Sequence, residues 1–191
     1  MKKFIFIALF GSLVSCRDEV QPKPNAYLAL DYPDANYSDF SSDNCPYSFD
    51  KNEIAVVTPS RVGNECWFNL EYPDLKGTIF ITYQPVQNNL DSLLTDAQKL
   101  PLRHTIKADA IEGSVYTNNF HRTYGMFYEI TGDAASQAQF YLTDSLDHFL
   151  TGSVYFEAQP NFDSILPAAS YIKKDIQHLM ETVEWKEEAN N

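Results

Sequence analysis

The chain has 191 residues, of which 44% are hydrophobic and 14% aromatic, a composition typical of a globular protein. It carries 14 basic and 26 acidic side chains, for a formal net charge of −12. Binding to nucleic acid depends on clustered lysine and arginine, so this balance argues against a nucleic-acid partner.

The first sixteen residues predict export and lipidation. Met1-Lys2-Lys3 precedes an apolar run that is too short for a membrane span, which needs roughly 20 apolar residues. Leu13-Val14-Ser15-Cys16 resembles the lipobox of bacterial lipoproteins, whose cysteine receives a diacylglycerol before cleavage and fatty acids such as palmitate afterwards. We expect a signal peptide at residues 1–15 and a lipid anchor at Cys16; a plain signal peptide is the alternative.

The mature chain would have 191 − 15 = 176 residues, which fits one domain. Residues 16–25 are polar and include Pro22 and Pro24, so they predict a semi-extended, lipidated tether. Residues 26–191 would then form one domain in the cell envelope. We expect this domain to lie in the periplasm, anchored by the lipid to the inner or the outer membrane. The lipid is its expected membrane attachment, because no later apolar run is long enough to cross a bilayer.

Short β-branched and alternating segments dominate the first half of the domain. Residues 26–30 predict a strand, and the region up to Asn44 reads as a loop whose aspartates lack the spacing of a calcium-binding EF-hand. Further strands are expected at residues 53–57, 66–72 and 77–83.

The hydrophobic period then changes to that of a helix at residues 90–100, with Asn88 or Asn89 as N-cap and Pro101 as the stop. Turn residues separate four more strand candidates, and a long apolar stripe predicts a last helix from Ser164 to Trp185. We therefore expect an α+β fold, an antiparallel sheet with helices packed on it, similar to the αβα sandwich of PsbP and Mog1. The four strand candidates are residues 110–116, 124–130, 138–142 and 149–156.

Cys45 and Cys66 form an even pair in an oxidising compartment once Cys16 carries lipid, and this predicts a disulfide. Their neighbours provide neither Cys-x-x-Cys redox spacing nor a histidine spaced for a metal site. Two buried free thiols, or cysteine chemistry, are the alternatives.

The densest group of reactive side chains lies at residues 104–110, where His104, Lys107 and Asp109 form a candidate functional surface. His104 and Asp109 could serve as a general base and acid. They are five residues apart, however, and this spacing does not bring them to the same face of a regular strand or of an ideal helix. The other histidines are isolated and no phosphate-binding or dinucleotide motif is present. We expect no catalytic residue, no metal and no cofactor.

Three triplets of Asp, Ser and an apolar residue begin at Asp91, Asp144 and Asp163. They resemble the O-glycosylation signal of exported Bacteroidetes proteins. Two of them also stand at predicted helix starts, where aspartate and serine are favoured for capping, so we favour a structural role, with glycosylation as the alternative.

Several segments together carry a resemblance to a known family: the lipobox and residues 45–49, 66–69, 88–90, 104–111, 134–136, 139–145, 175–182 and 184–186. With these segments the chain resembles the gliding-motility lipoprotein GldD family of Bacteroidetes. The resemblance implies a non-enzymatic component of the gliding and type IX secretion machinery, with other envelope proteins of that machinery as partners. A periplasmic hydrolase using His104 and Asp109, and a module that binds an envelope ligand, are the alternatives.

Overall fold

The computed structural model describes residues 32–157 and 162–186. The predicted signal peptide at residues 1–15, the lipidated Cys16, the tether at 16–25 and the strand at 26–30 lie outside the described residues. No helix in the described ranges is long and apolar enough to span a membrane.

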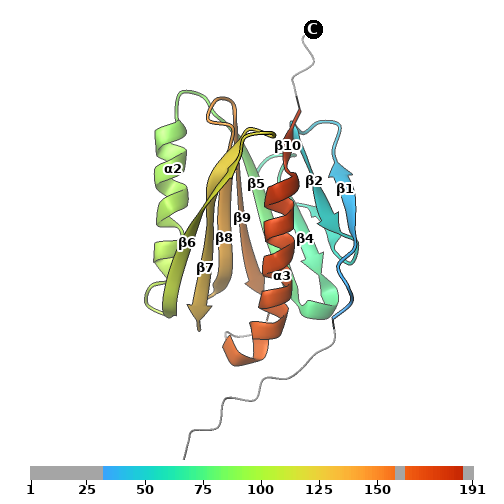
Figure 1. Cartoon of the computed structure of the whole chain (residues 1–191), viewed down its shortest axis with the longest axis vertical. Coiled ribbons are helices and arrows are strands. Elements are labelled where there is room, and N and C mark those ends of the chain that lie inside the picture. The colour runs from blue at the N-terminus through green and yellow to red at the C-terminus, as the bar shows by residue number, and fades with distance from the viewer. Residues whose placement is uncertain (1–31, 158–161, 187–191) are drawn as a thin grey trace, which may run out of the picture.

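Two antiparallel sheets and two helices make up the described chain, so the predicted α+β class is confirmed. The larger sheet has the order β3-β4-β5-β9-β8-β7-β6, and the smaller has the order β1-β2-β10 (Figure 1). The strands are β1 (Tyr37–Ser41), β2 (Tyr47–Asn52), β3 (Val56–Pro59), β4 (Phe68–Tyr72), β5 (Gly77–Pro85), β6 (Ala108–Asn118), β7 (Thr123–Gly132), β8 (Ser136–Thr143), β9 (His148–Phe156) and β10 (Glu184–Trp185). The helices are α2 (Leu90–Lys99), α3 (Phe162–Thr182) and the short 3-10 turns η1 (Pro73–Leu75) and η2 (Pro101–His104).

The two long helices cover opposite faces of the larger sheet. Successive side chains of a strand point to opposite faces, and on β8 Tyr141 packs with α2, whereas Phe140 and Leu142 belong to the core under α3. All eight residues of β8 are buried, as expected for a strand covered on both sides. The layer order is therefore helix, sheet, helix.

The apolar stripe of α3 packs on the larger sheet through Ile172, Ile176 and Leu179, each at most 1% exposed. The helix begins at Phe162, two residues before the predicted start, so Pro167 lies in its second turn rather than its first. Proline lacks the N–H that would bond four residues back, and the burial of the stripe outweighs this local loss.

The smaller sheet was largely missed by the sequence analysis. The region before Asn44 is not all loop, because β1 lies there and pairs with β2, with Phe40 opposite Phe49. β1 and β2 are short and rich in polar residues, so neither has a strong periodic signal. β10, with two residues, is too short to be recognised by pattern.

The strand predicted at residues 53–57 is displaced in the structure. Asn52 ends β2, its side-chain oxygen accepts the Ile54 N–H at 3.2 Å, and its carbonyl accepts the Ala55 N–H at 3.0 Å. These bonds form a turn, so β3 starts only at Val56.

The helix predicted at residues 90–100 is confirmed to within one residue, and Pro101 follows its end. Asn89 is the N-cap residue, but its side chain makes no capping bond to the helix. The Asn89 side-chain oxygen instead accepts the Gln87 N–H at 2.7 Å, which fixes the connection leading into the helix.

The predicted disulfide is confirmed between Cys45 and Cys66, whose side chains are 3% and 6% exposed. Cys45 immediately precedes the start of β2, and Cys66 lies just before β4. The bond therefore ties the smaller sheet to the larger one.

Replacing either cysteine by serine should destabilise the domain by about 3 kcal/mol, because the chain-entropy model gives that value for a loop of this size. The double variant should cost little more than either single variant, since all three lack the same bond. Thermal melting measures the effect, and thiol titration of the denatured, unreduced protein should find neither Cys45 nor Cys66 available. Two titratable thiols would contradict the assignment.

Candidate functional site

The side chains of His104, Lys107 and Asp109, the predicted functional surface, form no hydrogen bond or ion pair with one another in the described ranges. The His104 ring lies at the end of η2, with its Nε2 3.0 Å from Gln139 Nε2. Burial lowers the pKa of His104, so the neutral ring can accept the amide N–H at neutral pH. Lys107 and Asp109 are exposed, and the one hydrogen bond in the described ranges that joins either residue to His104 is a backbone bond, from the Lys107 N–H to the His104 carbonyl at 2.9 Å. This arrangement gives an acid–base pair no support.

Each of the other histidines has a separate partner. His121 Nδ1 lies 3.4 Å from a carboxylate oxygen of Glu184, and His178 Nε2 lies 3.5 Å from one of Asp50. His148 is discussed below. Among residues 32–157 and 162–186, no group of three or more His, Cys, Asp and Glu side chains could hold a metal ion.

A buried carboxylate fastens α3 to the smaller sheet. Asp175 is 4% exposed and accepts hydrogen bonds from Tyr37 Oη at 2.8 Å and Asn52 Nδ2 at 3.0 Å. Burial raises the pKa of Asp175, and the bonds from Tyr37 and Asn52 oppose that shift. The buried Tyr72 hydroxyl faces the same carboxylate, and burial together with the negative charge of Asp175 raises the pKa of Tyr72. Asp175 and Asn52 are buried and Tyr37 is half-buried, so this cluster mainly holds α3 to the smaller sheet.

The two ends of the larger sheet differ in which parts of the chain lie there. The described chain begins at Tyr32, which lines a cavity of about 320 Å³ together with residues of η1. We call this the proximal end; it is at the bottom of Figure 1. The opposite, distal end carries the β3–β4 loop (residues 60–67), the β6–β7 turn (119–122), the β8–β9 turn (144–147) and β10.

Aromatic side chains form a rigid base under the distal end. Tyr83 Oη lies 2.9 Å from His148 Nδ1, and the His148 ring stacks on Trp185 with centroids 5.1 Å apart. Trp67 Nε1 donates to the Tyr83 carbonyl at 2.7 Å. β4, β5, β9 and β10 are thus joined at one place, beside the disulfide.

Asp144 organises the β8–β9 turn. One of its carboxylate oxygens accepts the backbone N–H groups of Leu146, Asp147 and His148 at 3.0, 2.9 and 2.9 Å. Burial alone would raise the pKa of Asp144, but these donors outweigh it and hold the pKa below its usual value. The turn passes through Ser145 at a φ of 69° and leaves Leu146 63% exposed.

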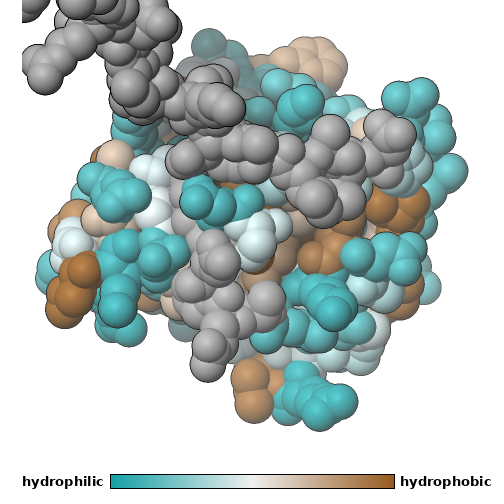
Figure 2. Space-filling view, turned by 90° about the horizontal axis from the view of Figure 1, so that it is seen from below, coloured by the Kyte–Doolittle hydropathy of each residue, from teal (hydrophilic) through white to brown (hydrophobic). Residues whose placement is uncertain are grey.

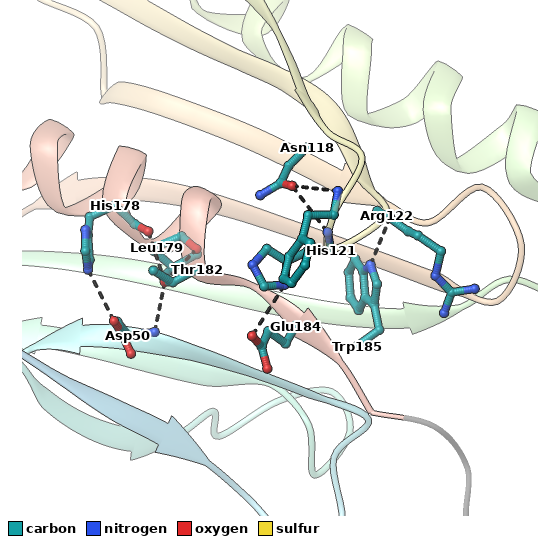
Figure 3. Close-up of polar contacts among 10 residues, drawn as sticks. Asp50, Asn118, His121, Arg122, His178, Leu179, Thr182, Glu184 and Trp185 are labelled. Carbon is teal, nitrogen blue, oxygen red and sulfur yellow. Dashed lines mark hydrogen bonds and ion pairs between the residues drawn. The ribbon is translucent and has the colours of Figure 1, made fainter.

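The β6–β7 turn is fixed in a similar way and lies over β10 (Figure 3). The Asn118 side-chain oxygen accepts the N–H groups of Phe120 and His121 at 3.0 and 3.2 Å. Arg122 has a φ of 52°, and its carbonyl accepts the indole N–H of Trp185 at 3.2 Å. Phe120, at the tip, is 88% exposed.

The β3–β4 loop folds onto the same base. Asn64 Nδ2 donates to the Tyr83 carbonyl at 3.2 Å, so this loop and Trp67 share one acceptor. Gly63 has a φ of 95° and lies so close to the Trp67 ring that an added Cβ would be 2.0 Å from it. Only glycine fits there. The adjacent Val62 is 72% exposed.

Val62, Leu146 and Phe120 therefore project from three fixed turns at one end of the sheet; we call them the distal tips. Five strand spacings of about 4.8 Å lie between the outer two turns, or about 24 Å measured along the sheet. Exposed apolar groups on pre-ordered loops lose little conformational entropy on binding. The arrangement is suited to docking a protein.

The proximal end also exposes apolar side chains, mainly Leu102 and Ile106 at 57% and 90%. Seen from below, the visible described surface there is mostly hydrophilic, with hydrophobic patches set apart from one another (Figure 2). This end lies where the described chain begins.

The segments that carry the family resemblance fall at both ends. Residues 45–49, 66–69, 88–90, the end of 139–145 and 184–186 meet at the distal end. Residues 104–111 and 134–136 lie at the proximal end. The densest group of reactive residues in the sequence, His104 to Asp109, therefore lies at the proximal end and not at the distal end.

Sequence reasoning did not identify the distal tips. Asn118 is one of the turn residues that separate the strand candidates, and Asp144 begins one of the three triplets that resemble a glycosylation signal. An Asn or Asp that is followed two residues later by an exposed apolar residue, between two strands, is a detectable signal of such a tip. Glycosylation at Ser92, Ser145 and Ser164 stays a prediction.

Comparison with known families gives one match that spans most of the chain. The model of the family described as "Gliding motility lipoprotein GldD" matches residues 17–185. No curated protein matches the chain at a significant level.

Replacing Asp144 by alanine should destabilise the protein by about 1–3 kcal/mol, because three backbone N–H groups lose their acceptor. Asp147→Ala is the matched control: its side chain is exposed in the same turn, so the effect should stay within about 0.5 kcal/mol.

The lowered pKa of Asp144 also predicts how this loss depends on pH. The contribution of Asp144 is present above its unfolded pKa of about 4 and disappears as the pH falls through the lower folded pKa. The difference in melting temperature between wild type and Asp144→Ala should therefore shrink in acid. A difference that is constant from pH 7 to pH 2 would contradict the assignment.

Proposed function

The chain belongs to the GldD family of gliding motility lipoproteins, and from this we propose that it is an envelope subunit that works by protein contacts through its distal end. The observation that supports the proposal is the set of three exposed apolar tips on fixed turns. The partners would be other envelope proteins of the gliding and type IX secretion machinery.

The proposed anchor gives the distal end its direction. If Cys16 carries the lipid, sixteen residues separate it from Tyr32, and a chain of that length spans at most about 55 Å. The described chain begins at the proximal end, so the tether would lead to that end and the distal end could turn away from the membrane. The distal tips would then be available to a partner in the periplasm.

The membership also favours a non-catalytic role. His104 and Asp109 have different surroundings and no shared contact, so the hydrolase alternative has no geometric basis. The ligand-binding alternative has one specific feature, the cavity of about 320 Å³ beside Tyr32 and Tyr72. Its small size and position at the proximal end distinguish it from the distal tips.

The test uses a variant with Val62, Phe120 and Leu146 all replaced by serine, expressed as the full chain in a gliding host that lacks the native gene. Colony spreading and secretion of type IX cargo should fall toward the level of the deletion. Exposed side chains contribute little to folding, so the amount of protein and the melting temperature should stay close to wild type.

Leu102→Ser with Ile106→Ser is the matched control, because it removes exposed apolar side chains from the proximal end. This variant should spread and secrete normally. Cys16→Ala serves as the reference for loss of the proposed anchor. The proposal fails if the distal variant is as active as wild type, or if the proximal variant is impaired to the same extent.

A further inference from the structure

The two edges of the larger sheet differ in how well they are protected. β3 has four residues and ends at Pro59, whereas β6 has eleven residues, from Ala108 to Asn118, with neither proline nor lysine among them. Proteins commonly protect edge strands with short length, proline or lysine, because unpaired backbone groups attract further strands. By this measure β3 is a closed edge and β6 an open one.

β6 is also accessible along most of its length. Its one hydrogen-bonded neighbour among the described strands is β7, and the residues from Glu112 to Val115 are all exposed. Val115 is 78% exposed. The register irregularity is confined to the start of the strand, between Ala108 and Ala110, so the remainder is regular and fit for pairing.

The face of β6 that is turned toward α3 has an unbalanced negative charge. Glu112 lies directly opposite Glu129 on β7, and like charges at such positions repel. Lys173 Nζ of α3 forms an ion pair with a carboxylate oxygen of Glu129 at 2.6 Å. Glu112 makes no hydrogen bond or ion pair within the described ranges, so a cation on an added strand would find it unpaired.

The opposite face of β6 carries two apolar side chains. Ile111 and Val115 alternate with Glu112 and Ser114 along the strand, so they point to the other side. A strand that carries basic residues on one face and apolar residues on the other would complement both faces at once.

We propose that β6 binds an extended segment of a partner protein by strand addition, and that this segment alternates basic and apolar residues. Main-chain bonds to the open edge would supply affinity, and the alternation would supply register. This contact is separate from the distal tips and does not depend on them.

A second copy of this chain fits the edge less well. Antiparallel pairing of two β6 strands about Gly113 places their Glu112 side chains as diagonal neighbours, roughly 7–8 Å apart. Each chain also carries a net charge of −12, which adds to the repulsion.

The test uses the full lipidated chain in detergent and two eight-residue peptides, one alternating lysine and valine and the other alternating glutamate and valine. The lysine peptide should bind, measured by fluorescence anisotropy, and should slow hydrogen exchange at alternate amides of β6. The glutamate peptide should not bind. Equal binding of both peptides, or protection at β3 instead of β6, would overturn the proposal.

Two pairs of variants make the result specific. Glu112→Lys should weaken binding of the lysine peptide about fivefold, whereas Asp147→Lys, with the same change in net charge at an exposed distal position, should not. Val115→Lys should weaken binding, whereas Val56→Lys in the closed edge strand should not. Equal effects within either pair would mean general charge attraction and would overturn the proposal.

The same experiment decides between occupants of the edge. Protection of β6 in the free chain that increases with protein concentration would assign the edge to a second copy. Protection at all concentrations without peptide would mean that the chain covers its own edge. Both results would overturn the proposal, and neither would affect the spreading phenotype expected of the distal tips.

Discussion

The packing of α3 between two sheets is the constraint on which the rest of the structure depends. Its apolar stripe lies on the larger sheet, and its flank joins β2 from end to end. Asp175 binds Asn52 at one end, Thr182 Oγ1 accepts the Asp50 N–H at 3.0 Å farther along, and the chain after the helix pairs with β2 as β10. Complete burial of each of the large apolar side chains contributes about 1.5–3 kcal/mol, enough to offset both Pro167 and the cost of burying a carboxylate. Without α3 the smaller sheet would keep only its disulfide and its aromatic contacts with the larger sheet, such as Phe40 with Phe68 and Tyr47 with Tyr83.

This packing also determines where a rigid surface can form. β10 can place Trp185 against His148 only because α3 delivers the chain to that end of the sheet. Trp185 in turn holds the β6–β7 turn through the Arg122 carbonyl, and the disulfide holds the start of β2 nearby. The distal tips are thus exposed side chains on a base that is fixed from below, which separates the surface for partners from the core that supports it.

The elements with strong periodicity were predictable from sequence. The apolar stripe of α3, the amphipathic pattern of α2 and the alternation in β5 each predicted its element without other information. The disulfide could be predicted from the even number of remaining cysteines and the oxidising compartment. β1, β2 and β10 were not predictable, because their pairing is decided by contacts with α3 and with one another that are distant in sequence. The turn at Asn52 displaced β3 through a local side-chain bond that a hydrophobic pattern does not register.

The candidate site was harder to predict for a related reason. Chemistry-bearing residues close in sequence, His104 to Asp109, attracted attention, but the structure gives them separate surroundings. The distal tips come from three turns far apart in the chain, and each is a single apolar residue that carries no motif. What reveals them is the antiparallel register, which brings the three turns to one end, and the Asn and Asp side chains that fix two of them.

Photocrosslinking in living cells tests the central claim most directly. A benzophenone amino acid would replace Phe120, Leu146 or, as the control at the proximal end, Ile106 in the full chain. The account predicts that the two distal positions crosslink to the same envelope protein and that Ile106 does not. Crosslinks to that protein from Ile106 but from neither distal position would contradict it.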